Sequence, residues 1–202
     1  KNYFKNYDFH NLYKELLNFC TVDLSSFYFD IRKDSLYCDS KSSKKRQSSI
    51  LLLNIILNSL LRWFAPILSF TTEEIFKLLS DKNKSIHLEK FIDFPDKFKN
   101  EKLNKKWLEL IKIRNTCNVS IEEKRASKEI GSSLEAQLVI NLNDNMKDIV
   151  KDIDFSELCI TSKAEIFYKK DINENIKTLK AKGTKCPVCW KINEEACPRH
   201  SE

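Results

Sequence analysis

Residues 53–75 read LNIILNSLLRWFAPILSFTTEEI, and the spacing of their apolar side chains is typical of a helix. The apolar positions recur three and four residues apart: Leu53, Ile56, Leu57, Leu60, Leu61 and Phe64. This spacing puts them on one face of an amphipathic α-helix. Pro66 marks the end region of the helix, because proline lacks the backbone N–H that a helix interior needs.

The same stretch predicts a second helix directly after the proline. Thr71 is placed to cap it, and Glu74 can reach back three residues later as a capping box. Phe70 and Ile75 have the spacing of a hydrophobic staple, which fixes the direction in which the chain enters a helix.

Helical spacing continues on both sides of this stretch. It is seen before it at Phe9, Leu12, Leu16, Phe19, Cys20, Leu24, Phe27, Tyr28 and Ile31, and after a polar loop over residues 81–85 at Leu103, Trp107, Leu110, Ile111, Arg114 and Cys117. Only two glycines and four prolines occur among 202 residues, which also favours long helices. The sequence therefore predicts a mainly α protein with an antiparallel helical bundle over residues 1–130.

The pattern changes after Gly131. Ala136, Leu138, Ile140 and Leu142 alternate with other residues, which predicts a strand. We expect a short helix over residues 146–153 and strands over 158–160 and 164–168. These elements make a small α+β unit over residues 131–170, followed by a lysine-containing linker over 171–183 and a terminal module over 184–202.

The terminal module carries Cys186, Cys189, Cys197 and His200, in two Cys-x-x-Cys/His pairs with seven residues between the inner cysteines. Four such ligands complete a tetrahedral structural zinc site. A redox dithiol and a disulfide are the alternatives. No βαβ pattern precedes the first pair, and seven cysteines without an apolar signal segment favour a reducing compartment. We expect a zinc knuckle that binds one Zn²⁺ per chain.

The net charge and the hydropathy of the sequence favour a nucleic acid as the partner over a membrane. The net charge of +6 suits a nucleic acid, although enrichment in Lys, Asn and Ile can also reflect an AT-rich genome. No run of eighteen apolar residues occurs, so we expect no membrane partner. The reducing compartment that the cysteines favour leads us to expect a cytoplasmic protein. The sequence starts at Lys1 rather than methionine, and we expect it to belong to a longer protein.

The sequence contains no recognisable catalytic motif. Nucleotide-binding glycine motifs, the nucleophile elbow and the metalloprotease helix motif do not occur. The three histidines, His10, His87 and His200, lie far apart in the sequence. We expect no catalytic residues in this chain.

Several stretches together resemble the C-terminal region of bacterial isoleucyl-tRNA synthetases, which are class I aminoacyl-tRNA synthetases. They are residues 18–28, 34–39, 60–75, 107–114 and 130–136, and the Cys-Pro-x-Cys-Trp run over 186–190. The resemblance extends over essentially the whole chain. The run over 60–75 is shared with the valyl and leucyl enzymes, whereas the cysteine run is more specific to the isoleucyl enzymes.

The resemblance implies the tRNA-binding part of an isoleucine–tRNA ligase, which acts in protein biosynthesis. Its partners would be the anticodon stem-loop of isoleucine tRNA and the upstream catalytic and editing domains of the same enzyme. ATP would bind only in that catalytic domain, so this chain alone would be inactive, and we expect a monomer. His200 stands where the family commonly has cysteine, and Val188 where it often has arginine.

Candidate RNA contacts surround the metal ligands. A zinc ion bound by three thiolates and an imidazole has a net charge near −1, so attraction must come from basic residues such as Lys185 and Lys191. Trp190 can stack on an unpaired base or pack over the knuckle as its small core, and the resemblance favours RNA. Lys44, Lys45 and Arg46, in a basic segment before the 48–64 helix, are further candidates. The alternative function is a stand-alone zinc-containing helical module that binds nucleic acid or protein.

Overall fold

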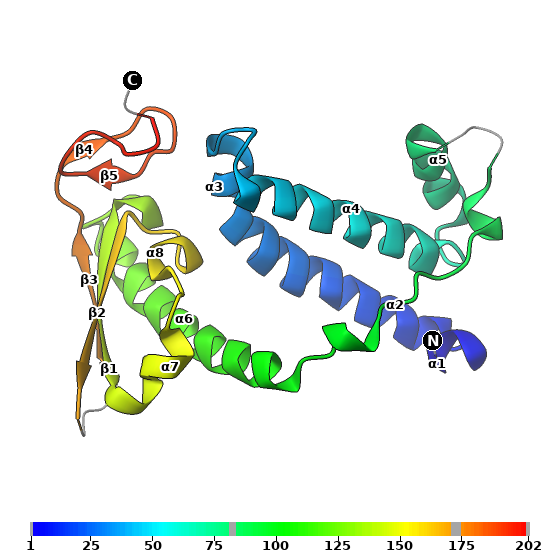
Figure 1. Cartoon of the computed structure of the whole chain (residues 1–202), viewed down its shortest axis with the longest axis horizontal. Helices are drawn as coiled ribbons and strands as arrows, with labels where there is room; N and C mark the ends of the chain where they lie inside the picture. Colours follow the sequence, from blue (N-terminus) through cyan, green and yellow to red (C-terminus); the bar gives the residue numbers. More distant parts are fainter. Residues whose placement is uncertain (1, 81–83, 171–174, 201–202) are drawn as a thin grey trace. The chain divides into compact units, whose positions relative to one another are not determined.

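The computed structural model describes residues 2–80, 84–170 and 175–200. The chain divides into two units, Lys1–Phe98 and Lys99–Glu202 (Figure 1). The first unit is helical, and the second combines a long helix with a small sheet and the cysteine-rich module. The mainly helical fold class with a small sheet region is therefore confirmed.

The helices of the first unit follow one another closely. They are α1 Asn2–Lys5, α2 Phe9–Asn18, the π-helical η1 Phe19–Phe29, α3 Asp30–Cys38, α4 Lys44–Phe64, α5 Ser69–Leu79 and the short η2 Ile86–Leu88 and η3 Asp96–Phe98. Asp8 caps α2 by accepting from the backbone N–H of Asn11. In Figure 1, α2, η1 and α3 run beside α4 in the opposite direction.

Helix α4 confirms the amphipathic helix predicted from residues 53–64, and it ends at Phe64, two residues before Pro66. It begins at Lys44, where the Ser43 side chain accepts a hydrogen bond from the backbone N–H of Arg46. Near its end Leu61 is buried in a core cluster with Ala65, Phe76 and Ile86. This cluster joins α4 to α5 and η2.

The predicted start of α5 is wrong. The helix begins at Ser69, and no side chain caps it at Leu68. The Leu68 carbonyl already accepts the backbone N–H of Thr72, so Thr71 lies inside the first turn and cannot be its cap. Phe70 is 92% exposed and therefore makes no staple contact.

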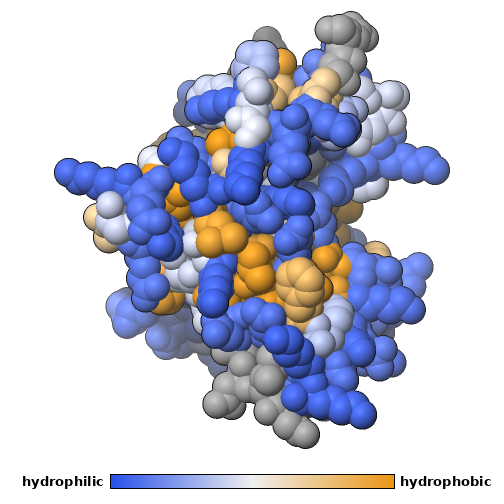
Figure 2. Space-filling model, turned by 90° about the vertical axis from the view of Figure 1, so that its left-hand side faces the viewer, coloured by the Kyte–Doolittle hydropathy of each residue, from blue (hydrophilic) through white to orange (hydrophobic). Residues whose placement is uncertain are grey.

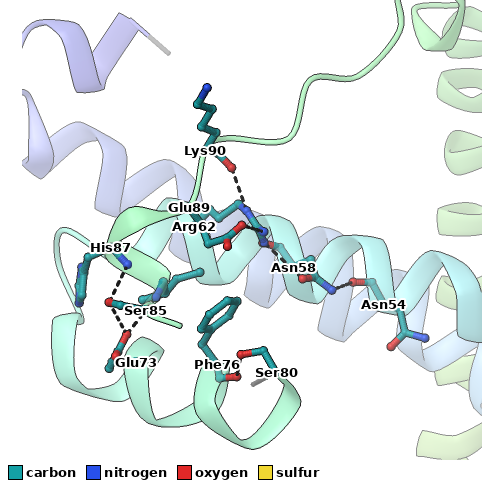
Figure 3. Close-up of polar contacts among 11 residues, drawn as sticks. Asn54, Asn58, Arg62, Glu73, Phe76, Ser80, Ser85, His87, Glu89 and Lys90 are labelled. Atoms are coloured by element: carbon teal, nitrogen blue, oxygen red, sulfur yellow. Dashed lines mark hydrogen bonds and ion pairs between the residues drawn. The ribbon is translucent and has the colours of Figure 1, made fainter. Parts of the chain in front are cut away.

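Polar contacts hold the segment after α5 in place (Figure 3). The Glu73 carboxylate accepts from the Ser85 hydroxyl and the Ile86 backbone N–H, both at 3.0 Å. On α4, Arg62 pairs with Glu89 at 2.7 Å and donates to the Lys90 carbonyl at 2.9 Å. Residues 81–83 of the predicted polar loop lie outside the described residues.

The second unit is built on a mixed sheet. Its elements are α6 Glu101–Ala126, η4 Ser133–Glu135, β1 Ala136–Asn143, η5 Asp144–Met146, α7 Lys147–Val150, α8 Phe155–Leu158, β2 Lys163–Lys169, β3 Asn175–Lys180, β4 Thr184–Lys185 and β5 Ile192–Asn193. The strand order is β2-β1-β3, in which β1 pairs parallel with β2 and antiparallel with β3. The strands predicted over 136–142 and 164–168 are confirmed as β1 and β2.

One face of this sheet is the core of the second unit. Ala136, Leu138, Ile140 and Leu142 are fully buried on β1, as are Leu110 and Cys117 on α6. A hydrogen bond of 2.8 Å joins Ser120 of α6 to the buried Thr178 of β3. Helix α6, which we expected in the bundle over residues 1–130, thus belongs to the unit that contains the sheet. The domain limits at 130, 170 and 183 stay predictions.

Three smaller expectations differ from the structure. Residues 158–160 form the end of α8 and a turn, because Ile160 has φ +56°, which no strand accommodates. The helix expected over 146–153 is limited to α7. The expected linker contains β3, whose Thr178 is buried although lysines surround it; its residues 171–174 lie outside the described residues.

No helix in the described part of the chain is both long and apolar enough to cross a membrane.

Candidate functional site

The terminal module is a tight hairpin that presents two cysteines on one turn. Strands β4 and β5 pair through Thr184 with Asn193 and Lys185 with Ile192. The Cys186 backbone N–H donates to the Lys191 carbonyl, and the Trp190 N–H donates to the Cys186 carbonyl. These bonds close the turn that carries Cys186 and Cys189.

The second pair is held by a turn of its own. The backbone N–H of His200 donates to the Cys197 carbonyl at 3.1 Å, so both side chains point from one short turn. The ligand atoms of Cys186, Cys189, Cys197 and His200 all lie within 4.8 Å of one another. The structure thus brings together all four predicted ligands in a cluster that could bind a metal ion.

The spacing of these atoms fits a tetrahedral ion. The Sγ atoms of Cys189 and Cys197 are 3.8 Å apart, and the His200 Nδ1 lies 3.6 Å and 3.5 Å from the Sγ atoms of Cys186 and Cys197. Zinc bonds of about 2.3 Å to sulfur and 2.0–2.1 Å to nitrogen give tetrahedron edges of about 3.8 Å and 3.6 Å respectively. The donor set and its geometry therefore fit Zn²⁺.

The protein environment alters the acidity of the thiols. Hydrogen bonds from the backbone N–H groups of Cys189 and Val188 lower the pKa of Cys186 to about 6. Burial acts against ionisation at Cys197, but the Arg199 N–H and the His200 ring outweigh it and lower its pKa. Burial raises the pKa of Cys189. Two of the three thiols are thus biased towards the thiolate that binds metal.

Trp190 follows Cys189 directly in the sequence but is 59% exposed. Its backbone is left-handed, with φ +65°. The Lys185 Nζ lies 5.4 Å from the centre of the indole ring, within range of a cation–π contact. Trp190 and Lys185 thus form an exposed aromatic and cationic pair, with Lys191 half-buried next to Trp190 in the sequence.

The other predicted RNA contacts belong to the first unit. Lys44, Lys45 and Arg46 form the first turn of α4. Arg46 also donates to the Asp39 carbonyl at 2.7 Å, which holds its guanidinium near the helix start. Val188, which replaces the arginine often found in the resembling family, is 54% exposed on the cysteine turn.

Sequence reasoning missed Ser162, which attaches the module to the sheet. Its hydroxyl accepts from the Ile192 backbone N–H at 2.6 Å and hydrogen-bonds the Leu134 carbonyl. A serine in a loop carries no motif that could have indicated this role. A pocket of about 380 Å³ lies at the same junction, with Gln137, Lys163 and Asn193 among its lining residues.

Comparison with known proteins gives consistent matches. Residues 1–140 match the family described as the anticodon-binding domain of tRNA ligase. The isoleucine–tRNA ligase of Pelagibacter ubique is 68% identical over the whole chain, which covers 22% of that protein. Those of Bartonella henselae and Methylacidiphilum infernorum are 36% and 38% identical over 95% and 96% of the chain, with 21% of each protein covered. The chain thus spans about a fifth of the length of the curated relatives it matches.

Proposed function

Because the chain belongs to the family of anticodon-binding domains of tRNA ligases, we propose that it is the tRNA-binding C-terminal part of an isoleucine–tRNA ligase. The observation that carries the proposal is the 68% identity over all 202 residues to a protein of that name. The ligand is the anticodon stem-loop of isoleucine tRNA. ATP-dependent aminoacylation and editing belong to upstream domains of the same cytoplasmic, monomeric enzyme.

The metal of the terminal module is Zn²⁺, one per chain, bound by Cys186, Cys189, Cys197 and His200. Three thiols and one imidazole in tetrahedral spacing support this choice. Protein side chains occupy all four coordination positions of the ion. The ion therefore cross-links the hairpin and has no open coordination position for a substrate. Its role is to hold a module that is too small to have an apolar core of its own.

Two kinds of side chain contact the RNA: an aromatic ring that stacks on a base, and basic groups that contact phosphates. Trp190 stacks on an unpaired base of the anticodon loop, which its exposure allows. Lys185 and Lys191 contact phosphates next to that base. Lys44, Lys45 and Arg46 contact the phosphate backbone from the start of α4. The helices of the first unit supply the bundle that presents this segment.

Titration of the 202-residue chain with labelled isoleucine tRNA tests the proposal. We expect saturable binding that weakens steeply with salt, and competition by the isolated anticodon stem-loop. A matched isoleucine tRNA whose anticodon stem-loop comes from another tRNA should bind more weakly. Equal affinity for both tRNAs, or no binding to either, would contradict the proposed function.

A further inference from the structure

The three-stranded sheet has an open second face. Alternate residues of β1 are buried, so Gln137, Val139 and Asn141 point to the opposite side. The register assigns their neighbours to the same face, which adds Lys163, Glu165 and Phe167 from β2 and Asn175, Lys177 and Leu179 from β3. Phe167 and Leu179 are 48% and 49% exposed. We call these nine residues the open sheet face.

The open sheet face has three rows of side chains across the strands. Lys163, Gln137 and Leu179 form the first row, Glu165, Val139 and Lys177 the second, and Phe167, Asn141 and Asn175 the third. Apolar, amide and charged side chains are therefore mixed over this face. Its one carboxylate, Glu165, is paired with Lys163 at 2.9 Å.

Figure 2 looks onto the side of the molecule where the strands lie in Figure 1. Apolar surface gathers at the centre of this view and is surrounded by hydrophilic side chains. An exposed aromatic with cationic and amide neighbours has the chemistry that binds unpaired nucleotides: the ring stacks on a base, amides read base edges, and lysines contact phosphates.

The open sheet face adjoins the terminal module. Gln137 and Lys163 of its first row also line the junction pocket, together with Ile192 and Asn193 of β5 and with Glu194 and Glu195, whose carboxylates follow β5. The Ser162 hydrogen bond fixes β5 against the start of β2. Trp190 and the open sheet face thus belong to the same unit, so a strand of RNA that reaches Trp190 could continue onto the sheet beside the pocket rather than over its carboxylates.

We propose that the open sheet face is a second contact surface for unpaired nucleotides of the bound RNA, with Phe167 as its stacking residue and Lys177 as its phosphate contact. This inference rests on the proposed function and extends it beyond the metal-binding module. The excess of cations over carboxylates favours a polyanion over an apolar protein surface as the occupant.

Substitution of Phe167 tests the stacking contact. Phe167→Ala should weaken binding of isoleucine tRNA about five- to a hundredfold, the range for loss of one base–aromatic stack. Phe167→Tyr keeps the ring and should bind like the parent chain. Phe70→Ala, at an equally aromatic and 92% exposed position on α5, is the matched control and should leave affinity unchanged. Lys177→Gln should lower the slope of log affinity against log salt by about 0.7, the value for one phosphate of a single strand.

A photocrosslinking residue at position 167 identifies the occupant directly. Crosslinks to anticodon-loop nucleotides support the proposal. If the parent binds tRNA while Phe167→Ala binds equally well and position 167 crosslinks only to protein, the open sheet face is a protein contact and the inference is wrong. Absence of tRNA binding by the parent would instead contradict the proposed function itself, so the two failures are distinguishable.

Discussion

At the scale of single residues, the two glycines of the chain have different constraints. Gly183 has φ +117°, and a Cβ added there would lie 2.0 Å from the Asn193 carbonyl oxygen. Any side chain at position 183 would therefore push β5 away from β4. A Cβ on Gly131 would meet only the flexible Glu135 carboxylate at 3.4 Å. Composition alone could not distinguish these two positions.

We expect Gly183→Ala to disrupt the metal-binding hairpin. Backbone strain of this kind costs about 1–3 kcal/mol, and metal binding is coupled to folding of the module. Zinc affinity should therefore fall about five- to a hundredfold, as measured by competition with a chelating dye. Gly131→Ala should bind zinc like the parent chain. Equal zinc affinities for the two variants would show that the close approach at Gly183 is unimportant.

Trp190 gives a second prediction at this scale. Trp190→Ala should weaken tRNA binding about five- to a hundredfold through loss of one stack, whereas Trp190→Phe should retain most of the affinity. Zinc content measured by elemental analysis is the control, because the residue adjoins the cysteine turn. A variant that keeps its zinc and binds tRNA like the parent would assign Trp190 a packing role only.

At the scale of elements, Glu73 connects α5 to η2. An ion pair with Lys77, together with hydrogen bonds from Ile86 and Ser85, lowers the pKa of this carboxyl from its usual 4.5. Because the pKa of Glu73 is lower in the folded than in the unfolded chain, its ionised carboxylate stabilises the folded state above about pH 4.5. This stabilisation is lost as the pH falls through the pKa that Glu73 has in the folded chain. Ile86, whose backbone N–H donates to this carboxylate, is 2% exposed.

We therefore expect acidification from pH 6 to pH 3.5 to loosen η2 before the rest of the first unit. The amide protection factor of Ile86, measured by hydrogen exchange, should fall severalfold over this range. In Glu73→Gln the protection should be lower at pH 6 and should depend less on pH. A protection factor in the parent that does not change with pH would rule out this role of Glu73.

The elements also show what sequence patterns can and cannot predict. The regular spacing of apolar residues predicted α4 and β1 correctly, because one buried face constrains many residues of an element at once. The start of α5 was missed because this helix begins after Leu68 without a capping side chain, so no capping motif marks it. Strand β3 was missed because its burial comes from α6, far away in the sequence, rather than from an apolar pattern. The clustering of Cys186, Cys189, Cys197 and His200 was predictable from their spacing alone, whereas the Ser162 attachment depends on tertiary structure.

At the scale of the whole molecule, we expect the terminal module and the sheet to have separate sources of stability. Leu110, Leu138, Ile140 and Leu142 are fully buried on α6 and β1, outside the terminal module. The hairpin has two residues in each strand and lacks such a core. The metal is thus expected to stabilise the module and little else.

Removal of zinc with a chelator should consequently unfold only residues 184–200. Far-ultraviolet circular dichroism should lose little helical signal, while amides of the hairpin should lose their exchange protection. Cys189→Ser should behave like the metal-free parent, and Cys117→Ser, a buried cysteine of α6, should keep its zinc. Loss of helical signal on chelation would show that the sheet depends on the metal.

A last prediction at this scale concerns catalysis. The sequence has none of the nucleotide-binding motifs, so the chain alone should not activate an amino acid. Isoleucine-dependent exchange of pyrophosphate into ATP should remain at background with this chain and appear with a complete isoleucine–tRNA ligase used as the positive control. Activity of the chain above background would overturn this expectation.

The parallel pairing of β1 with β2 determines when the second unit can finish folding as the ribosome makes it. Helix α6 and β1 emerge first, but parallel strands need a long crossover, and here α7 and α8 must follow before β2 is available. Until β3 also arrives, β1 has an unpaired edge that can join other chains. Released fragments that end before residue 175 should therefore be vulnerable to proteases and to aggregation, and released chains that extend beyond Lys180 should be protected.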